Sequence, residues 1–104
     1  MGSSGGQLER FRDLPRATVL GFDLPVATTR RARLLGLAFL DRELAGEGLL
    51  IPRCRSVHTF GMRFALDLVF LAADGRVVEL RREVPPSRLI RCRAADAVLE
   101  LPST

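Results

Sequence analysis

The sequence predicts a mainly β fold of the α+β class: a compact antiparallel β-barrel or jelly-roll-like sandwich with one short helix near the N-terminus. Three observations predict it. The chain has 104 residues, which suffices for one domain with a modest core. Short apolar runs recur between turn-forming residues, as in small closed or sandwiched β-domains. Asp74-Gly75 stands between two apolar runs and is a strong hairpin signal.

The composition is that of a folded domain, with 47% hydrophobic and 27% charged residues. The opening Met-Gly-Ser-Ser-Gly-Gly lacks apolar side chains after the methionine and predicts a flexible tail at residues 1–6. Residues 7–104 are then expected to form a single β-rich domain.

Taken in order, residues 7–16 predict a helical turn or a strand, and residues 17–22 predict the first strand. Thr28 or Thr29 can cap a helix, because its hydroxyl can accept a hydrogen bond from a free amide of the first turn. The apolar face of this helix is predicted from the spacing of Leu34, Leu35, Ala38 and Phe39.

Gly36 inside that pattern indicates a close contact or an early helix end. Further strands are predicted at residues 49–51, before Pro52, and at residues 88–92 and 97–101.

The hairpin around Asp74-Gly75 sets a predicted register for its two strands. A two-residue turn would place Leu71 opposite Val78, Val69 opposite Leu80, and Asp67 opposite Arg82. The first strand is apolar on both faces and is predicted to be central. A carboxylate there needs a partner, so Asp67 is expected to pair with Arg82, to accept backbone amides from a loop, or to face a ligand.

His58 is the chain's single histidine, and it could act as a base, a metal ligand or a hydrogen-bonded core residue. Cys54 is four residues upstream, about 13 Å away on an extended strand. Even with Cys92 the set reaches only three ligands, without the close-spaced pairs typical of zinc sites. We therefore predict no metal and no cofactor, with both cysteines as small apolar residues, although one disulfide between them remains open.

A candidate ligand site lies at the entrance of the predicted central strand. It combines an imidazole, a soft apolar side chain, a guanidinium and a carboxylate, a mixture that suits a small anionic or polar ligand. The alternative is an ordinary loop packed on the end of the barrel. The candidate ligand-binding residues are His58, Thr59, Met62, Arg63 and Asp67.

The charge pattern argues against nucleic-acid binding as the main function. The formal charge is +4, but sixteen basic residues are scattered among twelve acids, and no Trp or Tyr supplies a stacking platform. No apolar run reaches the ~18 residues needed to cross a bilayer, and no secretion signal opens the chain. The sequence predicts a soluble, cytoplasmic protein and does not determine its oligomeric state.

The stretch from Cys54 to Val78, with its Ser-Val-His-Thr-Phe-Gly-Met-Arg segment, resembles the core of the domain of unknown function 192 family. The resemblance extends roughly over residues 17–102 and favours the branch with Ser-Val-His-Thr-Phe-Gly-Met. The matching segments are residues 30–36, 48–52, 84–86, 91–92 and 97–102.

This resemblance implies a compact β-rich domain, barrel-like or jelly-roll-like, with a short helix near its start. It implies no established activity, substrate or cofactor. Many relatives carry proline where this chain has Ala65, and some replace the segment around His58. By position, the family's characteristic residues correspond here to Arg33, Thr59, Met62, Leu66, Asp67, Asp74 and Gly75.

Two functions of different classes follow from the sequence. The first is a binding or accessory module for a small molecule or a protein segment. The second is a hydrolase-like or metal-assisted enzyme that uses His58 with Asp67 or Cys54. A third possibility is an exposed sheet edge that accepts another strand.

Overall fold

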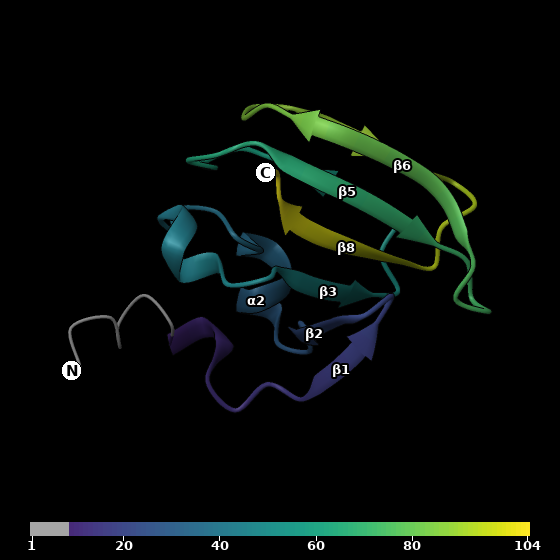
Figure 1. Ribbon diagram of the computed structural model, residues 1–104, viewed down its shortest axis with the longest axis horizontal. Helices are drawn as coiled ribbons and strands as arrows, with labels where there is room; N and C mark the ends of the chain where they lie inside the picture. The colour runs from purple at the N-terminus through teal and green to yellow at the C-terminus, as the bar shows by residue number, and fades with distance from the viewer. Residues whose placement is uncertain (1–8) are drawn as a thin grey trace.

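A four-stranded antiparallel sheet in the order β3-β8-β5-β6 forms the centre of the protein (Figure 1). The computed structural model describes residues 9–104, so the predicted tail at 1–6 and the predicted domain start lie outside the described residues. As predicted, the doubly apolar strand β5 is an inner strand, and its charged partner β6 forms an edge. The strands are β3 (Leu49–Pro52), β5 (Leu66–Leu71), β6 (Val77–Val84) and β8 (Ala97–Pro102).

Two antiparallel ribbons flank this sheet. One pairs β1 (Arg16–Val19) with β2 (Phe22–Pro25), and the other pairs β4 (Ser56–His58) with β7 (Leu89–Arg91). The described residues thus hold eight strands in three antiparallel sheets. The mainly β prediction is confirmed, and the sheets are arranged like a sandwich without closing into a barrel.

Within residues 9–104, three short helical segments complete the fold: η2 (Glu9–Phe11), α2 (Arg30–Leu35) and η3 (Arg42–Ala45). Helix α2 begins as predicted, because the Thr29 hydroxyl accepts a hydrogen bond from the Ala32 amide at 3.1 Å. It ends at Gly36, whose φ of +53° does not continue an α-helix. Within the described residues no helix is both long and apolar enough to cross a membrane.

The predicted apolar face of this helix is confirmed only in part, since Ala38 is buried and Leu35 is half-buried. Leu34 and Phe39 are 68% and 55% exposed, whereas Ala32 is buried. Leu34 lies two residues after the buried Ala32, which places it on the opposite side of the helix. Phe39 lies beyond the early end at Gly36, where the chain turns with the Ala38 amide bonded to Leu35 oxygen at 2.8 Å, so the helical period does not reach it.

Residues 17–22, predicted as one strand, instead form part of the β1–β2 hairpin. Val19 and Phe22 face each other across a two-residue turn made by Leu20 and Gly21, with φ of +54° and +84°. Two consecutive positive φ values are what a type I′ hairpin turn requires. The type I′ turn predicted from Asp74-Gly75 is therefore found in another hairpin.

Asp74 and Gly75 do lie in the β5–β6 turn, but the loop has three residues. Gly75 donates to Ala72 oxygen at 2.9 Å, and the Ala72 amide donates to Arg76 oxygen at 2.8 Å. Only Gly75 has a positive φ there, +90°, which is typical of a type I turn closed by a glycine bulge.

The extra turn residue shifts the end of the hairpin by one position, so that Leu71 faces Val77 instead of Val78. The predicted pairing of Val69 with Leu80 is confirmed.

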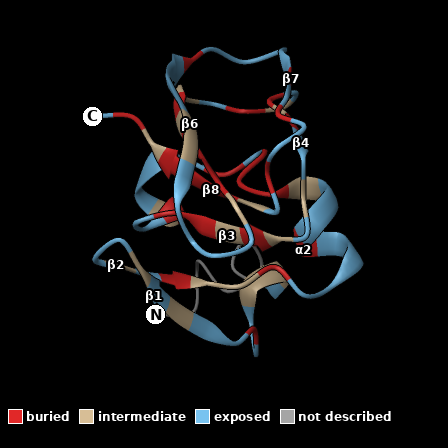
Figure 2. Ribbon diagram, turned by 90° about the vertical axis from the view of Figure 1, so that its right-hand side faces the viewer, coloured by how far each residue is buried: buried red, intermediate tan, exposed pale blue. Residues whose placement is uncertain are grey.

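The central sheet buries apolar side chains on both faces, as the red strands in Figure 2 illustrate. The larger cluster lies between the sheet, α2, η3 and the β4–β7 ribbon, and includes Leu66, Leu68 and Phe70. The smaller cluster lies under the β1–β2 hairpin and joins Leu24 to Val69. Alternate residues of β5 enter opposite clusters, as the pleat of a buried strand requires.

Gly36 provides a test of how α2 is joined to the sheet. A Cβ at Gly36 would stand 2.5 Å from Glu100 Oε1, at a φ that L-residues avoid. We expect Gly36→Ala to lower the free energy of unfolding by about 3 kcal/mol. Gly21→Ala is the matched control, since its φ is also positive but no atom lies within 4 Å of the added Cβ. Chemical denaturation measures both; equal losses would mean that the Glu100 contact contributes nothing.

Candidate functional site

The five predicted ligand contacts do not surround one cavity. Thr59 is fully buried, and its hydroxyl donates to Pro85 oxygen and accepts from the Arg88 amide, both at 2.8 Å. Met62 is buried in the larger apolar cluster. Thr59 therefore ties the segment after β4 to the chain before β7, and neither side chain is free to meet a ligand.

Arg63 and Asp67 have different partners and do not contact each other through a hydrogen bond or an ion pair. Arg63 forms an exposed ion pair with Asp41 at 2.7 Å. Asp67 accepts hydrogen bonds from the Ser103 hydroxyl at 2.6 Å and from the Glu83 amide at 2.9 Å.

The predicted Asp67–Arg82 ion pair is not among the ion pairs of the described residues. A register shift in β6 brings the Glu83 amide to the carboxylate instead. Partial burial favours the neutral form of Asp67, but the bonds from Ser103 and Glu83, with the charges of Arg82 and Arg42, lower its pKa below the ordinary value. The expected alternative was a backbone amide of a neighbouring loop, whereas this amide belongs to the strand β6.

His58 lines a small interior cavity that we call the Glu100 chamber. The chamber has a volume of about 30 Å³, room for a water molecule but not for a substrate. It lies between α2, β4, β8 and the end of β3. Its lining residues are Arg33, Leu34, Leu35, Ile51, Cys54, Ser56, Val57, His58 and Glu100.

Glu100 is the functional group that the sequence analysis missed. It is 3% exposed on β8, and its Oε1 accepts a hydrogen bond from the Leu37 amide at 3.3 Å. Burial raises the pKa of Glu100 to about 7, although the Leu37 amide acts in the opposite direction. The sequence signal was an acidic residue inside the apolar run 97–101, the same kind of signal that singled out Asp67.

His58 presents one bonded and one unbonded nitrogen. Its Nε2 lies 2.8 Å from Leu34 oxygen, so Nε2 carries the hydrogen and donates. In the neutral ring Nδ1 is then an acceptor, and it is buried without a partner among the described residues. The imidazole also stacks on Phe60, with ring centroids 5.6 Å apart.

Cys54 lines the same chamber as His58, but the Cys54 thiol is not activated as a nucleophile. Burial raises the pKa of Cys54, and its Sγ donates to Ser56 oxygen at 3.1 Å. Because the thiolate is the nucleophile, this thiol is not activated. Cys54 and Cys92 are both free, and the described residues contain no group of three or more His, Cys, Asp or Glu arranged to hold a metal.

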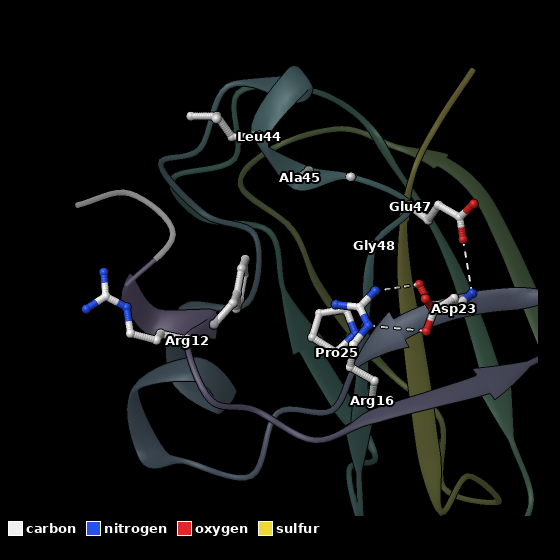
Figure 3. Close-up of a pocket in the computed structure, with 10 residues that line it drawn as sticks. Arg12, Arg16, Asp23, Pro25, Leu44, Ala45, Glu47 and Gly48 are labelled. Atoms are coloured by element: carbon white, nitrogen blue, oxygen red, sulfur yellow. Dashed lines mark hydrogen bonds and ion pairs between the residues drawn. The ribbon is translucent and has the colours of Figure 1, made fainter. Parts of the chain in front are cut away.

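A much larger surface cavity lies elsewhere, between η2, the β1–β2 hairpin and the segment from η3 to β3 (Figure 3). We call it the N-terminal cavity; its volume is about 470 Å³. The residues that line it are Phe11, Arg12, Arg16, Asp23, Pro25, Leu44, Ala45, Gly46, Glu47 and Gly48.

A chain of hydrogen bonds runs along one side of this cavity. Arg16 donates to the Asp23 carboxylate at 3.2 Å and to its carbonyl oxygen at 3.1 Å, and the Asp23 amide donates to Glu47 at 3.0 Å (Figure 3). Arg16 and Asp23 are 7 residues apart in the chain, and Asp23 and Glu47 are 24 apart. No short sequence motif therefore identifies the site.

Asp67 lines a neighbouring cavity of about 320 Å³ together with Arg42. Both cavities include Gly46 and Glu47 in their walls. Asp67 is thus the one predicted ligand contact that lies beside the N-terminal cavity, while His58 belongs to the Glu100 chamber.

The buried carboxyl of Glu100 should make stability depend on pH. Between its ordinary pKa and about 7, the folded protein keeps a proton that the unfolded chain has lost, so stability falls as pH rises through this range. We expect a loss of about 3 kcal/mol between pH 4.5 and 7.5 that Glu100→Gln abolishes. Urea denaturation across pH measures it, with the exposed Glu43→Gln as control. A pH slope that Glu100→Gln leaves unchanged would contradict the assignment.

Comparison with known proteins supports the fold and leaves the chemistry open. A crystal structure of a protein of unknown function from Novosphingobium aromaticivorans is similar, with a TM-score of 0.62 and 22% identity over 85% of this chain and 71% of the other. No curated protein matches the sequence. The family model described as uncharacterized ACR matches residues 14–104. The chain therefore belongs to the domain of unknown function 192 family.

Proposed function

We propose that this protein is a binding module for a small ligand with an apolar body and an anionic head, and that the N-terminal cavity is its binding site. The observation that carries the proposal is the cavity itself, about 470 Å³. Small-molecule sites typically occupy roughly 300 to 1,000 Å³ and combine apolar walls with a few polar groups.

Two arginines and two acids line the cavity, so the preference for an anion rests on which of these groups are already bound. Asp23 is already bound by Arg16, and Glu47 already accepts the Asp23 amide. Arg16 keeps guanidinium donors beyond those two bonds, and Arg12 has no ion pair within the described residues. Guanidinium groups bind carboxylates and phosphates through parallel hydrogen bonds. Phe11, Pro25 and Leu44 supply apolar wall for the rest of the ligand.

The proposal moves the ligand site away from the entrance of β5. Asp67 remains its neighbour, through the cavity that shares Gly46 and Glu47. The two free cysteines support a reducing compartment, in keeping with the cytoplasmic location predicted from the sequence.

The enzymatic alternative has weaker support. Cys54 and His58 do line one chamber, but the thiol has a raised pKa and the chamber admits about one water. A pair of His58 with Asp67 would need groups that line two different cavities. Binding without covalent chemistry is the function that the geometry favours.

A matched set of six-carbon probes tests the proposal: hexanoate, hexyl phosphate, hexanol and hexylamine. We expect the two anions to shift the backbone NMR signals of Gly46, Glu47 and Gly48, with hexylamine and hexanol binding at least about tenfold more weakly.

Arg16→Ala and Arg12→Ala should each weaken anion binding about tenfold, because each removes a charge-assisted contact. Arg76→Ala, at the exposed β5–β6 turn, is the control and should leave binding unchanged. Equal binding of hexylamine, or shifts that avoid residues 46–48, would overturn the proposal.

A further inference from the structure

Exposed apolar side chains gather on one side of the molecule, away from the N-terminal cavity. Seven large apolar side chains of the described residues are exposed. Four of them cluster near His58: Leu34 at 68%, Phe39 at 55%, Phe60 at 53% and Leu89 at 61%. We call these four residues the apolar patch. Contiguous exposed apolar patches commonly mark interaction sites.

The two aromatic members of the patch are linked through Gly61, the residue that follows Phe60. The Phe39 amide donates to Gly61 oxygen at 2.8 Å, and the Phe39 ring lies so close over Gly61 that a Cβ there would stand 2.6 Å from it. Phe60, the preceding residue, stacks on His58 with an interplanar angle of 23°. Both rings therefore lie against neighbouring groups on the surface.

His58 also links the two aliphatic members. Its Nε2 bonds to Leu34 oxygen, and in the β4–β7 ribbon it is directly opposite Leu89. Opposed residues in an antiparallel pair point to the same face. Figure 2 shows α2, β4 and β7 along the same side of the molecule.

Arginines border the patch on two sides. Arg30 and Arg31 precede Leu34 by four and three residues on α2, which makes them its neighbours on the helix surface. Arg91 follows Leu89 by two residues on β7 and therefore shares its outward face. All three are exposed, and none takes part in an ion pair of the described residues.

The carboxylate of Asp41, two residues after Phe39, is already held in an ion pair. Asp41 is paired with Arg63 at 2.7 Å, just beyond Phe60 and Gly61 in the chain. The surroundings of the patch thus combine an apolar centre with unpaired positive charge on both flanks.

We propose that the apolar patch is a docking surface for an acidic amphipathic segment of a partner protein. Apolar side chains of such a segment would cover Phe39 and Phe60, and its carboxylates would meet the guanidinium groups on either side. This surface is independent of the proposed ligand cavity.

The geometry favours this occupant over two others. Insertion into a membrane uses side chains that project freely into the bilayer, whereas the Phe39 ring packs on Gly61 and the Phe60 ring stacks on His58. A second copy of this chain would bring the same arginines against one another across a symmetric contact.

Two displayed peptide libraries test the proposal with the full chain as target. Each carries Leu or Phe at positions i, i+3, i+4 and i+7, flanked by Asp and Glu in one library and by Lys and Arg in the other. We expect the acidic library to be enriched, and the selected peptides to bind Phe60→Ser and Leu89→Ser at least about tenfold more weakly. Leu80→Ser is the matched control, since Leu80 is 51% exposed on the edge strand β6 and should bind like wild type.

Charge reversal supplies the decisive comparison. The combined Arg30→Glu and Arg91→Glu variant should lose the acidic peptides and select from the basic library. Failure of the acidic library to be enriched in a Phe60-dependent way would overturn the proposal. Phe60-dependent binding to phosphatidylserine vesicles, or a Phe60-dependent dimer in sedimentation, would overturn it in favour of a membrane or a second copy.

Discussion

The hydrogen bond from the Leu37 amide to the buried Glu100 carboxylate joins the end of α2 to the inner strand β8. The same peptide group is held from its other end, because Arg10 of η2 donates to Gly36 oxygen at 3.0 Å. Gly36 allows this close approach, since it has no Cβ to meet the carboxylate. A buried carboxyl is costly, and here it positions the helix, the Glu100 chamber and the exposed residues after the helix.

The possible sites of interaction lie on different sides of the molecule. The helix side holds the Glu100 chamber and, outside it, the apolar patch beside His58. The β1–β2 hairpin covers the opposite face of the sheet and forms one wall of the N-terminal cavity. One small sheet therefore supports two distinct surfaces, for which we propose a small anionic ligand and an acidic protein segment.

Asp67 shows how far local pattern can identify a site residue. Its position in an apolar strand correctly indicated a partnered carboxylate, but the partners are the Glu83 amide and the Ser103 hydroxyl instead of Arg82. Both partners come from parts of the chain far from Asp67 in sequence. The Glu83 amide reaches it through a register shift in β6, and Ser103 reaches it through the course of the chain after β8. His58 was likewise identified as polar and unusual, yet its partner Leu34 oxygen comes from α2, 24 residues earlier.

The sequence by itself determined the fold class, the central position of β5, a threonine cap at residue 28 or 29 and the Val69–Leu80 pairing, since alternation, capping and turn residues act over a few positions. It did not determine the two-residue turn at Leu20-Gly21 or the three-residue turn at Gly75, because glycine accepts several turn types. Only the tertiary structure placed Glu100 beside His58 and Cys54, and Arg16 beside Asp23 and Glu47. Burial and charge pairing over such separations depend on packing between elements, which no short-range pattern encodes.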